Sequence, residues 1–192
     1  MRYGQHMRST RERLIDVAAE LVDQGGAAAV TLREVGTRAG LSHNAPYKHF
    51  SDKQDLLASV AAAELDTLAQ QMRGAAAGHS TGRAKVHACA LTYVHWAQAH
   101  PTRFKLTFGP WGDVPHAELG HAAEAATQVI HECVGVAIDD GTLIGDASYI
   151  TTLVWALGHG AIDLSLAGHL RKKPNSPTPE DLVGHLLTRL AG

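Results

Sequence analysis

The side chains best suited to bind another molecule are concentrated in one short segment near the N-terminus. Asn44 offers an amide that can pair with adenine through two hydrogen bonds, and His43 stands beside it. The consecutive residues Tyr47, Lys48 and His49 offer a phenol, an ammonium group and an imidazole, which suit hydrogen bonds to phosphate oxygens. These residue types in this order predict a surface that binds nucleic acid.

Four further polar residues flank this segment. Ser42 is expected to cap the short helix that carries the five residues. Lys53 lies at the start of the next expected helix, where free backbone N–H groups and the helix dipole also favour phosphate. Thr31 and Arg33 precede the segment, and we expect them to hold the phosphate backbone on the opposite side.

Two questions stay open in this region. Tyr47 either faces DNA or packs in the core of a three-helix unit, which is the place that we expect for Phe50. The basic N-terminal residues either reach DNA as an arm or remain solvated. These basic residues are Arg2, Arg8, Arg11 and Arg13.

Two short helices joined by a glycine must hold the polar side chains. Thr31 and Glu34 form a capping box that starts the first of them, and Gly40 supplies the backbone freedom of the turn. A longer helix precedes the pair, between a capping box at Ser9 and a stop at Gly25–Gly26. Two short helices about such a turn form a helix-turn-helix, whose second helix lies in the major groove of DNA.

Helical periodicity continues over the rest of the 192 residues, so we predict an all-α fold of about nine helices. We expect a helix-turn-helix domain over residues 1–53 and a larger helical domain over residues 54–192. The first range carries 8 basic and 6 acidic residues and the second carries 9 and 13, which fits DNA contact by the first. A long helix should run from Gln54 to about Arg73, before a loop rich in glycine and alanine.

The cysteine content and hydropathy indicate a compartment. Cys89 and Cys133 are far apart in the chain and form no C-x-x-C motif, which suits a reducing cytoplasm and two buried small side chains. The N-terminus lacks the apolar segment of a signal peptide, and no run of about 18 apolar residues is long enough to span a membrane. We therefore expect a cytoplasmic protein with no membrane partner.

The sequence around the two short helices resembles the DNA-binding domain of the TetR family over about residues 9–57. The resemblance is carried by VTLREVGTRAGLS from Val30 to Ser42 and by APYKHFSDKQDLL from Ala45 to Leu57. The hexapeptide WALGHG, from Trp155 to Gly160, resembles the Trp/His-Gly signature of the C-terminal domain in one TetR subgroup. Pro46 departs from the pattern, because most members carry an aliphatic or aromatic residue there and proline removes a backbone N–H.

The resemblance implies a homodimeric repressor that binds a palindromic operator in double-stranded DNA. It also implies that residues 54–192 bind a small-molecule effector, which releases the repressor, and form the dimer. We expect the last two long helices to make the dimer interface as a four-helix bundle. Gly158 and Gly160 allow close approach there, and the leucines from Leu182 to Leu190 need an apolar partner.

The resemblance places the effector pocket among the helices between residues 65 and 169. Bulky side chains stand there in an alanine-rich context, and large groups among small ones can leave a cavity with apolar walls. Ordinary core packing is the alternative for at least half of them. The expected pocket residues are Leu65, Leu68, Tyr93, Trp96, Phe104, Phe108, Trp155 and His159.

Neither an enzyme nor a cofactor or metal site is expected. The chain lacks a phosphate-binding glycine loop, a nucleophile elbow and an H-E-x-x-H motif. His121 with Glu124 and His159 with Asp163 have the spacing of two metal ligands on one helical face, but no H-x-x-x-H or Cys/His cluster accompanies them. A ligand-independent DNA-binding or architectural protein and a metal-responsive regulator remain as alternatives.

Overall fold

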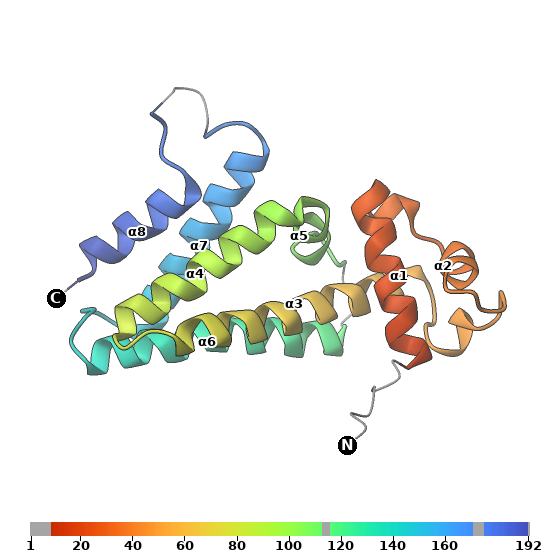
Figure 1. The fold of residues 1–192 in the computed structure, drawn as a ribbon, viewed down its shortest axis with the longest axis horizontal. Helices are drawn as coiled ribbons and strands as arrows, with labels where there is room; N and C mark the ends of the chain where they lie inside the picture. The colour runs from red at the N-terminus through yellow and green to blue at the C-terminus, as the bar shows by residue number, and fades with distance from the viewer. Residues whose placement is uncertain (1–8, 113–115, 171–174, 192) are drawn as a thin grey trace, which may run out of the picture. The chain divides into compact units, whose positions relative to one another are not determined.

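The computed structural model describes residues 9–112, 116–170 and 175–191, and over these residues the chain is helical (Figure 1). Eight α-helices and two short 3-10 helices are present there, with no β-strand, so the predicted all-α fold is confirmed. The α-helices are α1 (Thr10–Gly25), α2 (Leu32–Arg38), α3 (Lys53–Ala77), α4 (Gly82–Ala99), α5 (Pro101–Thr107), α6 (Ala117–Asp139), α7 (Ala147–Leu166) and α8 (Pro179–Arg189). The 3-10 helices are η1 (Ala27–Ala29) and η2 (Pro46–Lys48).

The chain divides into two compact units. The first unit comprises Met1–Glu64 and Thr102–Gly120, and the second comprises Leu65–Pro101 and His121–Gly192. Helices α3 and α6 therefore contribute to both units, and α5 belongs to the first except for Pro101. The domain boundary expected after residue 53 stays a prediction, and the compact units divide the chain at other positions.

Local signals in the sequence determine how α1 begins and ends. The Ser9 hydroxyl accepts a hydrogen bond from the Glu12 N–H at 3.2 Å, and the Glu12 carboxylate accepts one from the Ser9 N–H at 2.7 Å. This is the predicted capping box. The helix ends before Gly26, whose φ of 66° lies in the left-handed region that favours glycine. The apolar face of α1 packs with α2, Phe50 and the first turns of α3 as the core of the first unit.

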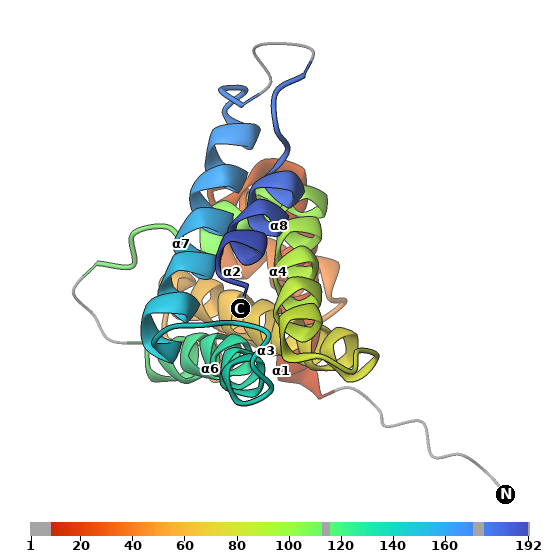
Figure 2. The same ribbon diagram turned by 90° about the vertical axis from the view of Figure 1, so that its left-hand side faces the viewer.

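In the second unit α4, α7 and α8 pack on one another (Figure 2). Helix α4 also meets α6 at Gly82, where an added Cβ would lie 2.2 Å from the backbone nitrogen and Cα of Ala137. The backbone N–H of Gly82 donates to Asp140 Oδ2 at 2.6 Å, and that of Arg83 donates to the Thr142 hydroxyl at 3.0 Å. The start of α4 is therefore fixed to the end of α6 by backbone packing and by two hydrogen bonds.

One helix boundary differs from the prediction. Helix α3 continues to Ala77, beyond the end expected near Arg73. The extension contains Ala75, Ala76 and Ala77, and alanine has the highest intrinsic helix propensity, so Gly74 alone does not stop the helix. The connection to α4 is correspondingly short.

Candidate functional site

The segment that carries the predicted DNA-binding residues is a turn followed by a 3-10 helix. The expected two-turn α-helix capped by Ser42 does not form, and η2 has no side-chain cap. The Ala45 N–H donates to the Ser42 carbonyl at 2.9 Å, and Pro46 has no N–H with which to continue an i→i−4 ladder. Pro46 thus occupies the first position of a 3-10 helix, where a missing N–H costs nothing.

Pro46 also packs the segment against α2. It is buried, and a Cβ added to Gly36 would lie 3.0 Å from Pro46 Cγ and 3.3 Å from its Cδ. The Leu41 N–H donates to the Gly36 carbonyl at 2.9 Å, which closes the turn on the same side. A glycine in α2 and the proline ring therefore fix the spacing between α2 and the polar segment, a role that sequence analysis missed because the two residues are ten positions apart.

The polar segment presents its side chains to solvent. Tyr47 is 58% exposed, which excludes the core position considered for it, whereas Phe50 is buried as expected. The other exposed residues of the segment are Ser42, His43, Asn44, Lys48 and His49. The structure thus places six of the nine predicted DNA-binding residues together on one exposed stretch of the first unit.

The remaining three predicted residues lie at the N-terminal starts of α2 and α3. Thr31 is the N-cap of α2 and accepts a hydrogen bond from the Glu34 N–H at 3.1 Å, which leaves its hydroxyl hydrogen available as a donor. Arg33 is exposed on the first turn of α2. Lys53 is the first residue of α3 and is half-buried.

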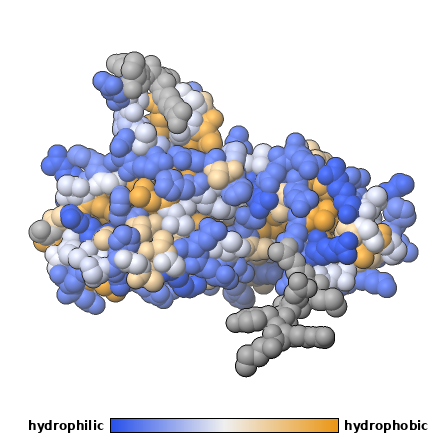
Figure 3. Space-filling view, viewed as in Figure 1, coloured by the Kyte–Doolittle hydropathy of each residue, from blue (hydrophilic) through white to orange (hydrophobic). Residues whose placement is uncertain are grey.

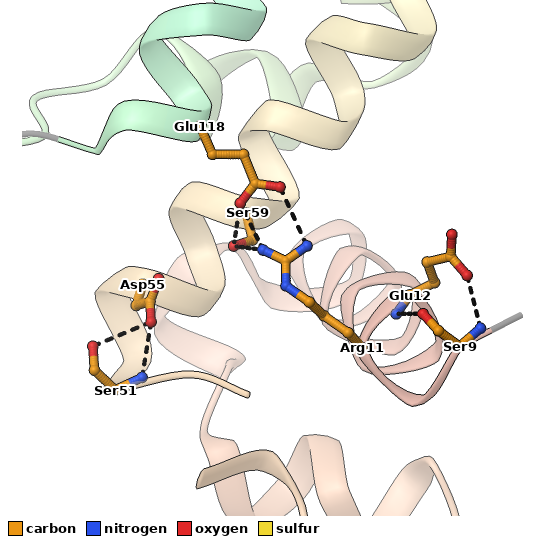
Figure 4. A network of polar contacts seen from close by, with 7 residues as sticks. All are labelled: Ser9, Arg11, Glu12, Ser51, Asp55, Ser59 and Glu118. Atoms are coloured by element: carbon orange, nitrogen blue, oxygen red, sulfur yellow. Dashed lines mark hydrogen bonds and ion pairs between the residues drawn. The ribbon is translucent and has the colours of Figure 1, made fainter. Parts of the chain in front are cut away.

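The Arg11 side chain makes its contacts within the first unit (Figure 4). Its guanidinium bridges to Glu118 Oε2 at 2.6 Å and donates to the Ser59 hydroxyl at 2.8 Å, and its Cζ lies 5.4 Å from the centre of the Phe50 ring. Glu118 stands in the first turn of α6, so Arg11 connects α1, α3 and α6. Of the other arm residues considered, Arg2 and Arg8 lie outside the described residues.

A second arginine connects α5 to α1 and α3. Arg103 donates from Nε and Nη2 to the two Asp23 carboxylate oxygens at 2.9 and 2.5 Å, and from Nη1 to Glu64 Oε1 at 2.6 Å. Burial acts to lower the pKa of Arg103, but the hydrogen bond to Asp23 and the charges of Glu64 and Asp23 outweigh it and raise that pKa. No local motif marks Arg11 or Arg103, because each finds its partners only through the fold.

The residues expected to line an effector pocket fall in both units. Phe104 on α5 and Phe108, the residue after α5, belong to the first unit, where their ring centres lie 5.4 Å apart. The other six belong to the second unit: Leu65, Leu68, Tyr93, Trp96, Trp155 and His159. The pocket as a whole stays a prediction.

Within the second unit, a polar and aromatic cluster joins α4 to α7. The Tyr93 hydroxyl lies 2.9 Å from His159 Nδ1, and the Tyr93 ring stacks on Trp96 with centres 6.3 Å apart. The Trp155 ring lies 5.6 Å from that of His159 and is 42% exposed. Burial lowers the pKa of His159, and the charge of Asp163 opposes this only in part, so the imidazole is neutral at neutral pH.

Three hollows lie away from this cluster. One of about 670 Å³ lies between α6 and α7 and is lined by polar residues that include Gln128, His131 and Thr151. One of about 460 Å³ lies between α4 and α8, beside His87. A third, of about 330 Å³, lies in the first unit beside Leu57 and Trp111.

The described part of the chain has neither a metal-binding cluster nor a membrane-spanning helix. No group of three or more histidine, cysteine, aspartate or glutamate side chains stands close enough there to hold a metal ion. No described helix is long and apolar enough to cross a membrane.

Comparison with known proteins identifies two regions of the chain. The protein-family model described as "Tetracyclin repressor-like, C-terminal domain" matches residues 86–190. A second family model, described as "Bacterial regulatory proteins, tetR family", matches residues 14–60. A curated relative, the HTH-type transcriptional regulator AcrR of Shigella flexneri, is 38% identical over 56 residues. That stretch is 29% of this chain and only 26% of the relative's length.

Solved structures match over nearly the whole chain. A protein of unknown function from Rhodococcus sp. RHA1 has a TM-score of 0.81 at 28% identity, covering 98% of this chain and 97% of that one. A tetR-family regulatory protein from Rhodococcus RHA1 has a TM-score of 0.69 at 16% identity and covers 97% and 98%. The regulator FadR from Bacillus subtilis, solved with stearoyl-CoA, has a TM-score of 0.74 at 12% identity and covers 94% and 97%. The last two likenesses show the fold alone.

Proposed function

Because this chain belongs to the TetR family of transcriptional regulators, we propose that it is a repressor that a small-molecule effector releases from a palindromic operator. The family consists of DNA-binding regulators and not of enzymes, which confirms the expectation that this chain is no enzyme. The observation that carries the proposal is the exposed polar segment on the helix-turn-helix, with six side chains that can bond phosphate or base edges.

We assign different tasks to the residues of this surface. Asn44 and His43 precede η2 and read base edges, because an amide can pair with adenine through two hydrogen bonds. Tyr47, Lys48 and Lys53 bind phosphates. The free N–H groups at the start of α3 add to the attraction at Lys53. Base contacts set the sequence preference and phosphate contacts supply affinity that does not depend on sequence.

The proposed dimer uses α7 and α8 of each chain. Helix α7 leaves Tyr149, Leu153 and Leu164 exposed, and Figure 3 shows hydrophobic surface where α7 ends. Gly160 has no neighbouring atoms within 4 Å of an added Cβ, so a partner helix has room to approach it, whereas Gly158 faces Tyr93 of its own chain. The partly exposed leucines are Leu182 and Leu186 on α8 and Leu190 at its C-cap.

A two-fold dimer presents two equal recognition segments. It therefore requires an inverted repeat with half-sites about one DNA turn apart, roughly 34 to 36 Å. Sedimentation of the purified chain tests the dimer. A monomer at micromolar concentration that still binds operator would contradict it.

Helix α3 is the proposed lever between effector and operator. It begins at Lys53 beside the DNA-binding segment, and its later turns carry Leu65 and Leu68 of the proposed pocket. An effector that displaces α3 moves the recognition segment out of register with its two-fold mate. The effect must be reciprocal: a tenfold loss of operator affinity requires a tenfold loss of effector affinity, a coupling of about 1.4 kcal/mol.

The experiment that tests the proposal has two steps. Thermal shift against a small-molecule library identifies an effector, because a ligand that binds only the folded state raises the melting temperature. Operator binding is then titrated with that effector for the parent and for Trp155→Ala. We expect the variant dimer to bind operator within a few-fold of the parent and to respond less to effector. A parental response would place Trp155 outside the pocket, and no stabilising ligand would favour a ligand-independent DNA-binding protein.

A further inference from the structure

The two cysteines of the chain meet in the core of the second unit. Cys89 on α4 and Cys133 on α6 are 44 residues apart, yet their sulfur atoms lie 3.7 Å from each other. Cys89 Sγ also lies 3.5 Å from the carbonyl oxygen of Met72 on α3. Both cysteines are buried, as the sequence predicts, but their contact was not expected.

The two thiols are not equivalent. Cys89 is fully buried, whereas Cys133 retains 7% of its surface. The hydrogen bond from Cys89 lowers the pKa of Cys133 to about 7 against the effect of burial, and the charge of Lys85 adds to the lowering. The same bond and burial raise the pKa of Cys89. Cys133 is therefore the sulfur that ionises and the one that a solute reaches first.

We propose that Cys89 and Cys133 form a reversible intrachain disulfide on exposure to hydroperoxides, and that this bond lowers operator affinity. The thiolate of Cys133 attacks one peroxide oxygen, the O–O bond breaks, and the departing oxygen takes a proton to leave as water or alcohol. Cys89 then gives up its proton and attacks the sulfenic sulfur, and the displaced hydroxide leaves as water. Two thiols lose two electrons, the peroxide gains them, and a dithiol reverses the reaction.

We infer that closing the disulfide combines rotation of the two side chains with a movement of α4 against α6. The sulfur separation must fall from 3.7 Å to about 2.05 Å. The two helices are already in backbone contact where Gly82 meets Ala137, and the bond from Gly82 to Asp140 fixes that end. We therefore expect any helix displacement to be larger toward the opposite ends of α4 and α6.

Those opposite ends lead directly to the arginine networks of the first unit. Helix α4 ends at Ala99 and is followed at once by α5, which carries Arg103. Helix α6 begins at Ala117, next to Glu118, the partner of Arg11. Arg11 lies on α1 and Arg103 binds Asp23 of α1, the helix that packs with α2 in the core of the first unit. The regulatory half of the inference rests on the proposed function, whereas the disulfide itself does not.

Mass spectrometry of the intact parent chain tests the disulfide without any variant. The reduced protein is treated with hydrogen peroxide, alkylated under denaturing conditions and digested. We expect a single crosslinked peptide pair joining Cys89 to Cys133 within one chain, and its loss after dithiothreitol. In Cys89→Ala the reaction should stop at a sulfenic acid on Cys133 that dimedone traps. Two free thiols after treatment, or crosslinks only between chains, would overturn the proposal.

Operator titration then tests the consequence for DNA binding. We expect the oxidised parent to bind operator about tenfold more weakly than the reduced parent, and the double variant Cys89→Ala/Cys133→Ala to be unaffected by peroxide. A disulfide that leaves operator affinity unchanged would overturn the regulatory half. If the reduced protein binds no DNA sequence selectively, the proposed function fails, and the peptide result still decides the disulfide.

Discussion

Removal of the Arg103 guanidinium should destabilise the first unit far more than removal of an exposed arginine. Arg103→Met keeps most of the apolar stem and loses three hydrogen bonds, two to Asp23 and one to Glu64. The Arg103 side chain is only 18% exposed and the Glu64 side chain 14%. Water can therefore replace little of the hydrogen bonding that the Glu64 carboxylate loses. Loss of the Arg103 guanidinium should therefore lower the free energy of unfolding.

The magnitude follows from the exposure of each partner. Asp23 is more than a third exposed, and water can solvate it after the change, so this arm contributes less than about 1 kcal/mol. The bond to the shielded Glu64 contributes about 1.5 to 3 kcal/mol, as hydrogen bonds to charged groups do. We expect a loss of about 2 to 3 kcal/mol in the free energy of unfolding. Arg103→Lys should lose about half of that, because an ammonium can bind Glu64 but not both Asp23 oxygens at once.

Denaturant unfolding at fixed protein concentration, followed by circular dichroism, measures this difference. Arg38→Met is the matched control, since the bonds of Arg38 to Glu34 and Gln24 are both exposed, and an exposed ion pair such as that with Glu34 contributes about 0.5 kcal/mol or less. Equal losses for the two variants would refute the reasoning. So would a change below about 0.5 kcal/mol for Arg103→Met.

Three further predictions concern the DNA-binding segment and the pH dependence of stability. Gly36→Ala should cost about 1 to 2 kcal/mol by forcing a Cβ against the Pro46 ring, and thermal melts should show a smaller cost in a Pro46→Ala background, where that ring is gone. His159→Gln should weaken the fall in stability between pH 7.5 and 5.5. Burial lowers the pKa of His159 below 6.5, so the unfolded chain takes up the proton first and stability is lost as the pH falls; equal slopes for parent and variant would contradict this. Lys53→Ala should weaken binding to all DNA sequences and reduce the salt slope by about one, whereas Asn44→Ala should relax discrimination by about 1 to 3 kcal/mol at one base; uniform loss in both would refute the division of tasks.

Features that depend on a few neighbouring residues could be predicted from the sequence. The capping box at Ser9 and the stop at Gly26 depend on residues within one helical turn of each other. The burial of Phe50 followed from its place after the polar segment. Such signals predict the helices well because they act before any distant contact forms.

Features that depend on long-range contacts could not be predicted. No neighbouring residue in the sequence indicates that Arg11 and Arg103 bind partners on other helices. The approach of Cys89 to Cys133 depends on how α4 crosses α6. The missing N–H of Pro46 could be recognised in the sequence, but its packing against Gly36 of α2 could not. The exposure of Tyr47 was likewise one of two alternatives until its position in the fold was known.

Selection of binding sites from a random double-stranded DNA library tests the central claim most directly. The purified reduced chain is incubated with the library at physiological salt, and the bound fraction is amplified and sequenced over several rounds. The account predicts enrichment of one inverted repeat whose half-site centres are about 10 base pairs, or a multiple of one turn, apart. Enrichment of no sequence, or of a site without two-fold symmetry, would contradict a homodimeric regulator that reads its operator through two equal helix-turn-helix units.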